Sequence, residues 1–349
     1  MLSRPHGRLA LMAASPTDAP VFIVGANRSG TTLLRLLLNA HSRIAIPDEL
    51  VYLDSYVAGV PIEQWRRPGL SAAAYAAFVD RFLREQCAPL SGIDRGALRD
   101  AILAGRPDLR RPYQLALRAW AQQQGKARWG EKTPGNLFYA DVLLDMFPEA
   151  LFLYVVRDPR AGVASMQRVS FFPDDTCFNA LSRRKHDTEG RRHLARHVPA
   201  AQRMTVQYET LVQAPASTLR AVCHFLGEAF EPQMLRFHQD AGRHMNDAAQ
   251  NGHNTAATQP ITDARIDAWT RRLSAKQTAL VEHICADVLS AFGYRPTGRR
   301  LSWTTRGELL VRQAYWHWQC WRHRHIRHYT VKHPLFARTR TRLRSLLLG

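Results

Sequence analysis

The stretch VFIVGANRSGTTLLRLLLNA, residues 21–40, decides the fold of this chain. Its first four residues, 21–24, are all apolar, as is typical of a buried parallel strand. A glycine-containing turn follows at 25–30, and residues 31–40 have the leucine-rich pattern of a helix. In such a strand–turn–helix unit, successive backbone N–H groups and the helix N-terminus can face one anion together. We therefore predict a phosphate-binding loop.

The residues inside this loop narrow the kind of phosphate that it binds. Gly25 and Gly30 have the Walker spacing, but the lysine expected after the second glycine is Thr31. Nucleoside-triphosphate enzymes place that lysine on the β- and γ-phosphates. Its absence disfavours a kinase or an ATPase, although an atypical P-loop nucleotide kinase remains an alternative. Arg28 is the candidate for a positive charge inside the loop.

The remaining pattern places this loop in an α/β fold. The apolar run at 151–156 (LFLYVV) predicts a second strand, and 204–208 (MTVQY) a third, short one. Strands that alternate with helices indicate a P-loop-type central parallel sheet flanked by helices. The helices are predicted at 61–126 (mainly helical, with breaks), 141–147, 161–167, 216–226, 263–269 and 275–292.

Two long polar segments, 170–200 and 240–260, show no clear period. Irregular segments of this length inside a compact domain are often lids or substrate loops, and some are disordered. We predict lids that cover a substrate.

The charge of the chain is concentrated at its C-terminal end. The 349 residues carry a formal net charge of +19, and residues 299–349 alone hold 12 Lys and Arg against one acid, Glu308. We divide the chain into a flexible leader (1–19), an α/β domain (20–298) and a basic helical tail (299–349). The tail holds four of the eight tryptophans: Trp303, Trp316, Trp318 and Trp321.

Two helices are predicted in this tail, at 308–329 and 335–348. Basic faces beside Trp and Leu suit peripheral contact with a membrane surface. They also suit an anionic carrier, a nucleic acid or a second subunit in a homodimer. The plain alternative is an appendage that packs on the domain and keeps a solvated basic face. A non-catalytic anion-binding or membrane-surface protein is therefore a second reading of the whole chain.

The cysteines and the N-terminal segment indicate a cytoplasmic protein. Five widely spaced cysteines form neither a disulfide framework nor a zinc motif, so a reducing compartment and no metal are expected. Residues 1–19 have too short an apolar stretch for a signal peptide. No apolar run approaches the length of a membrane span.

Several segments together resemble one enzyme family. The stretch 22–49 (FIVGANRSGTTLLRLLLNAHSRIAIPDE) is similar to the 5′-phosphosulfate loop of sulfotransferases that use 3′-phosphoadenosine-5′-phosphosulfate (PAPS). The branch that contains tyrosylprotein sulfotransferases and many bacterial enzymes is the most similar. The resemblance continues through RWGEKTPGN, LFLYVVRDPRAGVASM and VQYETLV, and more weakly through 261–274 and Gly293-Tyr294. The matching segments follow the family's order, so they are stronger evidence than the loop alone.

The resemblance implies a set of donor-binding residues. Arg157 and Ser165 correspond to the pair that holds the 3′-phosphate, and Tyr208 matches a position near the nucleotide. Arg157 directly follows a predicted strand, at the edge where open α/β sheets bind ligands, and arginine binds phosphate through paired charged bonds. The 5′-phosphosulfate is expected on the loop, at Arg28, Ser29, Gly30, Thr31, Thr32 and Leu33.

The resemblance also implies the catalytic residues. Glu49 falls at the family's catalytic glutamate, and a carboxylate near an acceptor hydroxyl can act as general base. Asp48 is a second acid beside it. Lys132 matches the lysine near the bridging oxygen, where it and Arg28 would neutralise the charge that develops. His41 also matches the family, but we interpret it as a structural histidine.

The sequence departs from the family at several positions. Arg168 is shifted by one place from a family arginine, and Gln259 replaces a donor-contacting lysine of some relatives. His253 and Thr255 are further candidates for donor contacts. The predicted function is transfer of a sulfuryl group from PAPS to an acceptor hydroxyl by in-line displacement. A small molecule, a glycan, a lipid and a peptide all remain open as acceptors.

Overall fold

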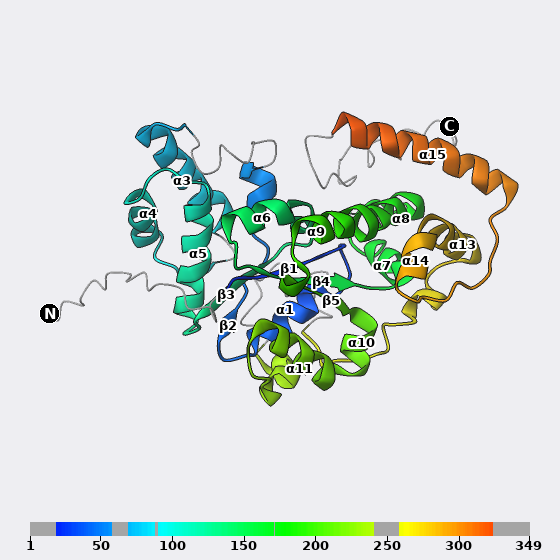
Figure 1. The fold of residues 1–349 in the computed structure, drawn as a ribbon. Helices are drawn as coiled ribbons and strands as arrows, with labels where there is room; N and C mark the ends of the chain where they lie inside the picture. Colours follow the sequence, from blue (N-terminus) through cyan, green and yellow to red (C-terminus); the bar gives the residue numbers. More distant parts are fainter. Residues whose placement is uncertain (1–18, 58–68, 88–89, 171, 241–257, 324–349) are drawn as a thin grey trace.

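The computed structural model describes residues 19–57, 69–87, 90–170, 172–240 and 258–323 (Figure 1). Its centre is a sheet of five parallel strands in the order β2-β3-β1-β4-β5. This arrangement confirms the predicted α/β fold with a central parallel sheet. The strands are β1 (Val21–Gly25), β2 (Ile44–Ala45), β3 (Arg128–Lys132), β4 (Leu151–Val156) and β5 (Arg203–Gln207).

The register of the strands brings their carboxyl ends to one edge. Ile23 of β1 pairs with Lys132 of β3, and Gly25 pairs with Val155 of β4. On the far side of β4, Val156 pairs with Gln207. The residues that follow these strands therefore start from the same edge of the sheet, where ligands bind in open α/β folds.

Helices cover both faces of the sheet (Figure 1). Along β1, Phe22 and Val24 belong to one buried cluster, and Val21 and Ile23 belong to another on the opposite face. The helices are α1 (Thr31–Asn39), α3 (Ala72–Gln86), α4 (Arg95–Leu103), α5 (Arg110–Gln123), α6 (Ala140–Met146), α7 (Pro159–Met166), α8 (Thr176–Lys185), α9 (Arg191–His197), α10 (Tyr208–Gln213), α11 (Pro215–Leu226), α13 (Ala275–Ile284), α14 (Ala286–Ala291) and α15 (Trp303–Arg322).

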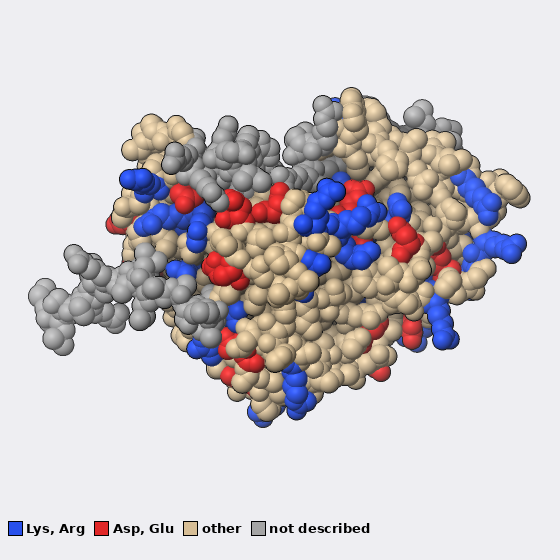
Figure 2. Space-filling model, in the orientation of Figure 1, with Lys and Arg blue, Asp and Glu red and all other residues tan. Residues whose placement is uncertain are grey.

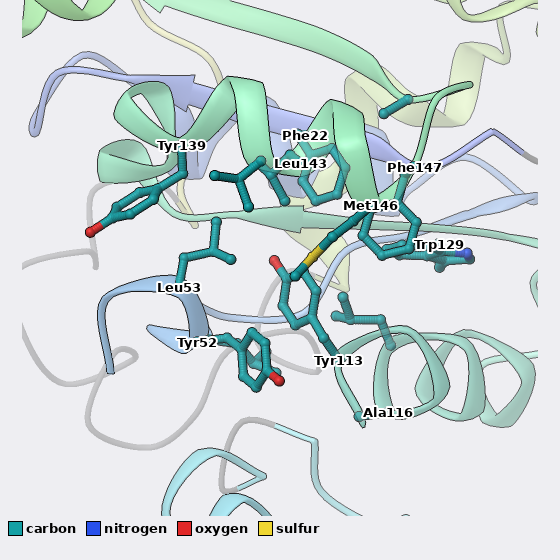
Figure 3. Packing of buried hydrophobic residues seen from close by; sticks show 14 of the residues in the cluster. Phe22, Tyr52, Leu53, Tyr113, Ala116, Trp129, Tyr139, Leu143, Met146 and Phe147 are labelled. Atoms are coloured by element: carbon teal, nitrogen blue, oxygen red, sulfur yellow. The ribbon is translucent and has the colours of Figure 1, made fainter. Parts of the chain in front are cut away.

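The larger core is rich in aromatic rings. The ring of Phe22 lies 6.1 Å from that of Trp129 in an edge contact, and Tyr52 stacks on Tyr113 at 4.8 Å (Figure 3). Tyr113 lies on α5, and Tyr52 lies a few residues after Glu49. This packing fixes the segment that carries Glu49 against the sheet.

The prediction that residues 170–200 are irregular is wrong, whereas a role in covering a substrate stays a prediction. The segment forms α8, a π-turn at His186–Gly190 and α9. Asp175 caps α8 by accepting from the backbone N–H groups of Cys177 and Phe178. The basic residues that hid this helix in the sequence include Arg183, which is buried because it pairs with Asp187.

Other predicted boundaries shift. The predicted helix at 263–269 is reduced to a 3₁₀ turn at Ala268–Arg271, and the predicted helix at 275–292 breaks at Cys285 into α13 and α14. The first tail helix begins earlier than predicted, at Trp303. Residues 1–18, most of 240–260 and the predicted helix at 335–348 lie outside the described residues.

Candidate active site

The loop after β1 has the backbone of an anion-binding turn. Gly25, Arg28 and Gly30 have positive φ angles of 154°, 66° and 98°. A Cβ at Gly25 would lie 2.4 Å from the Val155 carbonyl oxygen, and a Cβ at Gly30 would lie 2.4 Å from Tyr208 Cδ2. Glycine is therefore required at both positions by close contacts as well as by conformation.

The N-terminus of α1 is suited to an anion. Its N-cap residue is Gly30, which has no side chain to cap the helix, and its first turn contains no acid. The helix dipole and the first N–H groups of α1 thus favour an anion at this end. Beside it, the Ser29 hydroxyl is buried and has no hydrogen-bond partner among the described residues. An unsatisfied buried hydroxyl in this position fits a ligand oxygen.

The predicted 3′-phosphate residues meet the loop. Arg28 Nε donates to Ser165 Oγ at 3.1 Å, although the two residues are 137 positions apart. The Arg157 guanidinium lies 4.1 Å from the centre of the Tyr208 ring and donates to the Arg28 carbonyl at 3.4 Å. Arg157 Nε is buried without a hydrogen-bond partner in the described part of the chain.

The electrostatics of this cluster also favour an anion. Burial, and then the charge of Arg157, lowers the pKa of Arg28 to about 10. Burial likewise lowers the pKa of Arg157. The buried Arg157 and the partly buried Arg28 repel each other, and a phosphate between them would offset that cost.

The predicted catalytic residues lie together beside the loop. Lys132 Nζ donates to Glu49 Oε1 at 2.5 Å. The lysine side chain is 1% exposed, whereas that of Glu49 is 43% exposed. The Glu49 charge acts to raise the pKa of Arg28, so these two residues are within electrostatic range of each other. The structure thus brings Glu49 into contact with Lys132 and near Arg28.

Asp48 has a different role from its neighbour. Its carboxylate pairs with the Arg35 guanidinium at 2.9 Å, and both side chains are largely buried. Arg35 also donates to the Ile46 carbonyl at 3.4 Å. Asp48 therefore anchors its segment to α1, and Glu49 is the acid left open to solvent.

Comparisons with known proteins agree with this geometry. Residues 20–232 match the sequence pattern described as the sulfotransferase family. The chain belongs to this family. It is 23% identical over 281 residues to a putative protein-tyrosine sulfotransferase of Caenorhabditis briggsae, covering 78% of this chain and 88% of the relative. It is 26% identical over 283 residues to the protein-tyrosine sulfotransferase of Drosophila melanogaster, covering 79% of this chain and 52% of the relative.

A solved structure has the same fold. The sulfotransferase domain of the Synechococcus PCC 7002 olefin synthase superposes with a TM-score of 0.55 at 24% identity, covering 79% of this chain and 95% of that domain. The chain is therefore a transferase of the sulfotransferase family, with tyrosylprotein sulfotransferases among its relatives.

One residue next to the candidate site was not singled out from the sequence. Glu131, directly before Lys132, is fully buried and accepts from the Thr133 hydroxyl and, at 2.5 Å, from Asn136 Nδ2. Burial raises the pKa of Glu131 to about 8, and the nearby Glu49 charge acts in the same direction. A second carboxyl thus lies behind the Glu49–Lys132 pair.

Arg183 is a second residue that was not singled out from the sequence, and its guanidinium holds the backbone of the phosphate-binding loop. Its Nη2 donates to the Arg157 carbonyl at 2.6 Å and its Nη1 to the Asn27 carbonyl at 3.2 Å. Its Nε donates to Asp187 at 2.6 Å. Arg183 of α8, held by its buried ion pair with Asp187 of the following π-helical turn, therefore joins the phosphate-binding loop to the end of β4. The only sequence signal was the spacing of Arg183 and Asp187 by four residues.

Glu209 connects two of the segments that resemble the sulfotransferase family. Its carboxylate accepts from the Asp158 backbone N–H at 3.0 Å and from the Tyr294 hydroxyl at 2.8 Å. The Gly293-Tyr294 segment is thus tied to the turn that carries Arg157. This contact is structural and keeps the turn in place.

The other sequence candidates are accounted for as follows. His41 Nε2 lies 2.9 Å from the Ala229 carbonyl, and the Arg43 backbone N–H donates to its Nδ1, so both ring nitrogens are engaged in structural contacts. Arg168 is exposed, and its charge helps to lower the pKa of Arg28. His253 and Thr255 lie outside the described residues. Within the described ranges, no group of three or more His, Cys, Asp and Glu could hold a metal ion.

Proposed function

We propose that this chain transfers the sulfuryl group of PAPS to an acceptor hydroxyl, with Glu49 as general base. The observation that carries the proposal is the Lys132–Glu49 pair beside the uncapped N-terminus of α1. Members of the family are transferases, and the donor, the base and the acceptor of this member are what we infer. The donor supplies the sulfuryl group when bound and leaves as the 3′,5′-bisphosphate.

The residues around the loop suit the two phosphate groups of this donor. The backbone from Ser29 to Leu33 and the unpartnered Ser29 hydroxyl would hold the 5′-phosphosulfate. Arg157, with its unpartnered Nε, and Ser165 would hold the 3′-phosphate. The Tyr208 ring keeps the Arg157 guanidinium in place from one side.

Glu49, Lys132 and Arg28 suit the acceptor and the transfer step. Glu49 is exposed enough to meet an incoming hydroxyl and would take its proton as the new oxygen–sulfur bond forms. Lys132 is held rigidly in the core, and its ammonium would stabilise the negative charge on the oxygen that leaves sulfur. Arg28 would add a second positive charge from the loop.

Donor binding and transfer test this proposal separately. Isothermal titration with the 3′,5′-bisphosphate product should show one site without added Mg²⁺. Incubation with sulfur-labelled PAPS and a panel of phenols, alcohols, sugars and tyrosine peptides should label at least one acceptor. If the protein bound Mg²⁺-ATP instead of the bisphosphate, the kinase alternative would replace this proposal.

A further inference from the structure

The tail helix α15 is fixed to the body of the protein by one of its faces. Leu309 and Trp316 are almost fully buried, and the Trp316 ring lies 6.1 Å from Phe178 of α8. Arg312 pairs with Asp175, the N-cap of α8, at 2.5 Å. The helix therefore has a defined orientation, at the upper right of Figure 1.

The opposite face of α15 carries an apolar stripe. At about 100° per residue, Gly307 and Ala314 fall on the same side of the helix as five large apolar residues, with no charged residue between them. The stripe lies about 180° from Leu309 and Trp316. Its large residues are Trp303 (85% exposed), Leu310 (68%), Val311 (71%), Trp318 (46%) and Trp321 (62%).

This exposure is concentrated on α15. Of the seven large hydrophobic residues that are exposed in the described part of the chain, six lie on this helix, and Val51 is the other. In the space-filling view the ridge formed by α15 is mostly tan, the colour of residues other than Lys, Arg, Asp and Glu (Figure 2). A contiguous apolar surface of this kind marks an interaction site.

Cationic side chains border the stripe. The Arg306 guanidinium lies 5.2 Å from the Trp303 ring, and that of Arg322 lies 5.5 Å from the Trp318 ring. Seven further Lys and Arg, and no acid, follow residue 323 in the sequence. A binding partner that complements this surface has an apolar interior to receive the stripe and anionic groups to pair with the arginines.

We propose that α15 binds the surface of an anionic membrane, with the stripe of Trp303, Leu310, Val311, Trp318 and Trp321 inserted among the lipid headgroups. The charge favours this occupant over a second copy of the chain, because pairing two tails that each carry 12 Lys and Arg against one acid would be repulsive. Tryptophan is also enriched at the level of lipid headgroups. The helix lies along the surface, since no helix in the described ranges is long and apolar enough to cross a membrane.

Vesicle co-sedimentation of the full-length protein tests the proposal. We expect binding to vesicles of phosphatidylcholine mixed with phosphatidylglycerol, and much weaker binding to phosphatidylcholine alone. The double substitution Trp318→Ser and Trp321→Ser should weaken binding to the anionic vesicles by roughly tenfold or more, because two buried rings are lost. Binding of the 3′,5′-bisphosphate and the melting temperature should stay near those of the wild type, since both rings face away from the domain.

Two double variants that lose the same charge distinguish the effect of the arginines beside the stripe from the effect of net charge. Arg306→Gln with Arg322→Gln should weaken vesicle binding by about fivefold per arginine. Arg84→Gln with Arg95→Gln removes the same charge from exposed positions on α3 and α4 and should leave binding unchanged. Equal losses in the two pairs would overturn the proposal in favour of non-specific attraction.

Two other results would also overturn it. One is failure of the wild type to bind anionic vesicles. The other is a dimer, measured by light scattering, that becomes a monomer in the Trp318→Ser, Trp321→Ser variant, since the stripe would then be a contact between two copies.

Discussion

Lys132 Nζ and Glu49 Oε1 lie 2.5 Å apart, but the two side chains have opposite environments. The lysine is enclosed at the end of a central strand, and the glutamate reaches solvent. The lysine therefore has one fixed position, while the carboxylate can exchange its lysine contact for an acceptor hydroxyl. A general base next to a fixed cation suits sulfuryl transfer, because the proton is removed where the leaving oxygen can also be stabilised.

The first prediction concerns Glu49. Glu49→Gln should lower kcat by about 10²–10⁴-fold, the usual contribution of a general base. The affinity for the 3′,5′-bisphosphate should stay within about twofold of the wild type, since we propose that Glu49 acts on the acceptor and not on the donor. Steady-state kinetics and calorimetry together check both parts, and near-normal turnover would remove Glu49 from this role.

Asp48→Asn is the matched control. Asp48 pairs with the buried Arg35, so the variant leaves a buried guanidinium without its counter-charge. We expect the free energy of unfolding to fall by about 3–5 kcal/mol at most, and the melting temperature to fall with it. Turnover per folded molecule should be largely kept. A specific loss of turnover in Asp48→Asn would instead make Asp48 the base.

The second prediction concerns Arg157. Arg157→Ala should weaken bisphosphate binding by about 10–100-fold, as expected when a charged hydrogen bond is lost. Arg157→Lys keeps the charge but not the paired geometry of the guanidinium. Its bisphosphate affinity should lie between those of the wild type and Arg157→Ala. Arg168→Ala, at an exposed arginine near the same cluster, should cost much less because its charge is screened. An unchanged dissociation constant in Arg157→Ala would contradict the 3′-phosphate assignment.

The third prediction concerns the contact between Gly30 and Tyr208. Gly30→Ala would place a Cβ 2.4 Å from the tyrosine ring at a φ of 98°. The loop or the ring must then move, and we expect bisphosphate affinity to fall by at least about tenfold. Tyr208→Phe keeps the ring against Arg157 and should bind the bisphosphate with wild-type affinity. Tyr208→Ala removes the ring and should bind the bisphosphate weakly. If Tyr208→Phe lost as much affinity as Tyr208→Ala, the hydroxyl rather than the ring would be the functional group.

The parts of the fold that were predicted from sequence are those with a simple local pattern. β4 is an unbroken apolar run, and the structure confirms its bounds at Leu151–Val156. β3 was not predicted as a strand because its sequence, RWGEK, is mostly polar. It is nevertheless fully buried, since Arg128 donates to the Leu226 and Ala19 carbonyls, which are far away in sequence.

The same distinction applies to the site. Ser165, Arg157 and Tyr208 were inferred from family resemblance, and Arg28 from its place in the phosphate-binding loop. The structure brings the four side chains into one cluster, and their roles stay predictions. Arg183 was not foreseen, because two of its three partners, Asn27 and Arg157, lie in segments distant in sequence. Side chains that support a site through long-range burial leave almost no local signal in one sequence.

The last prediction concerns the buried Glu131. Its pKa is raised to about 8, so between about pH 4.5 and pH 8 the folded protein holds a proton that the unfolded chain releases. The stability from this proton is complete below the unfolded pKa and is lost as the pH rises through the folded pKa. Glu131→Gln removes this dependence and keeps one carbonyl oxygen for Thr133 or Asn136.

Urea unfolding from about pH 5 to about pH 9 measures the effect. Over this range the free energy of unfolding should fall by a few kcal/mol more in the wild type than in Glu131→Gln. Above about pH 8 the difference between the two curves should stop changing. Comparing the two proteins cancels the histidines that titrate in the same range, because both proteins share them. Parallel curves would show that Glu131 stays ionised in the folded protein, with Lys132 then balancing both carboxylates.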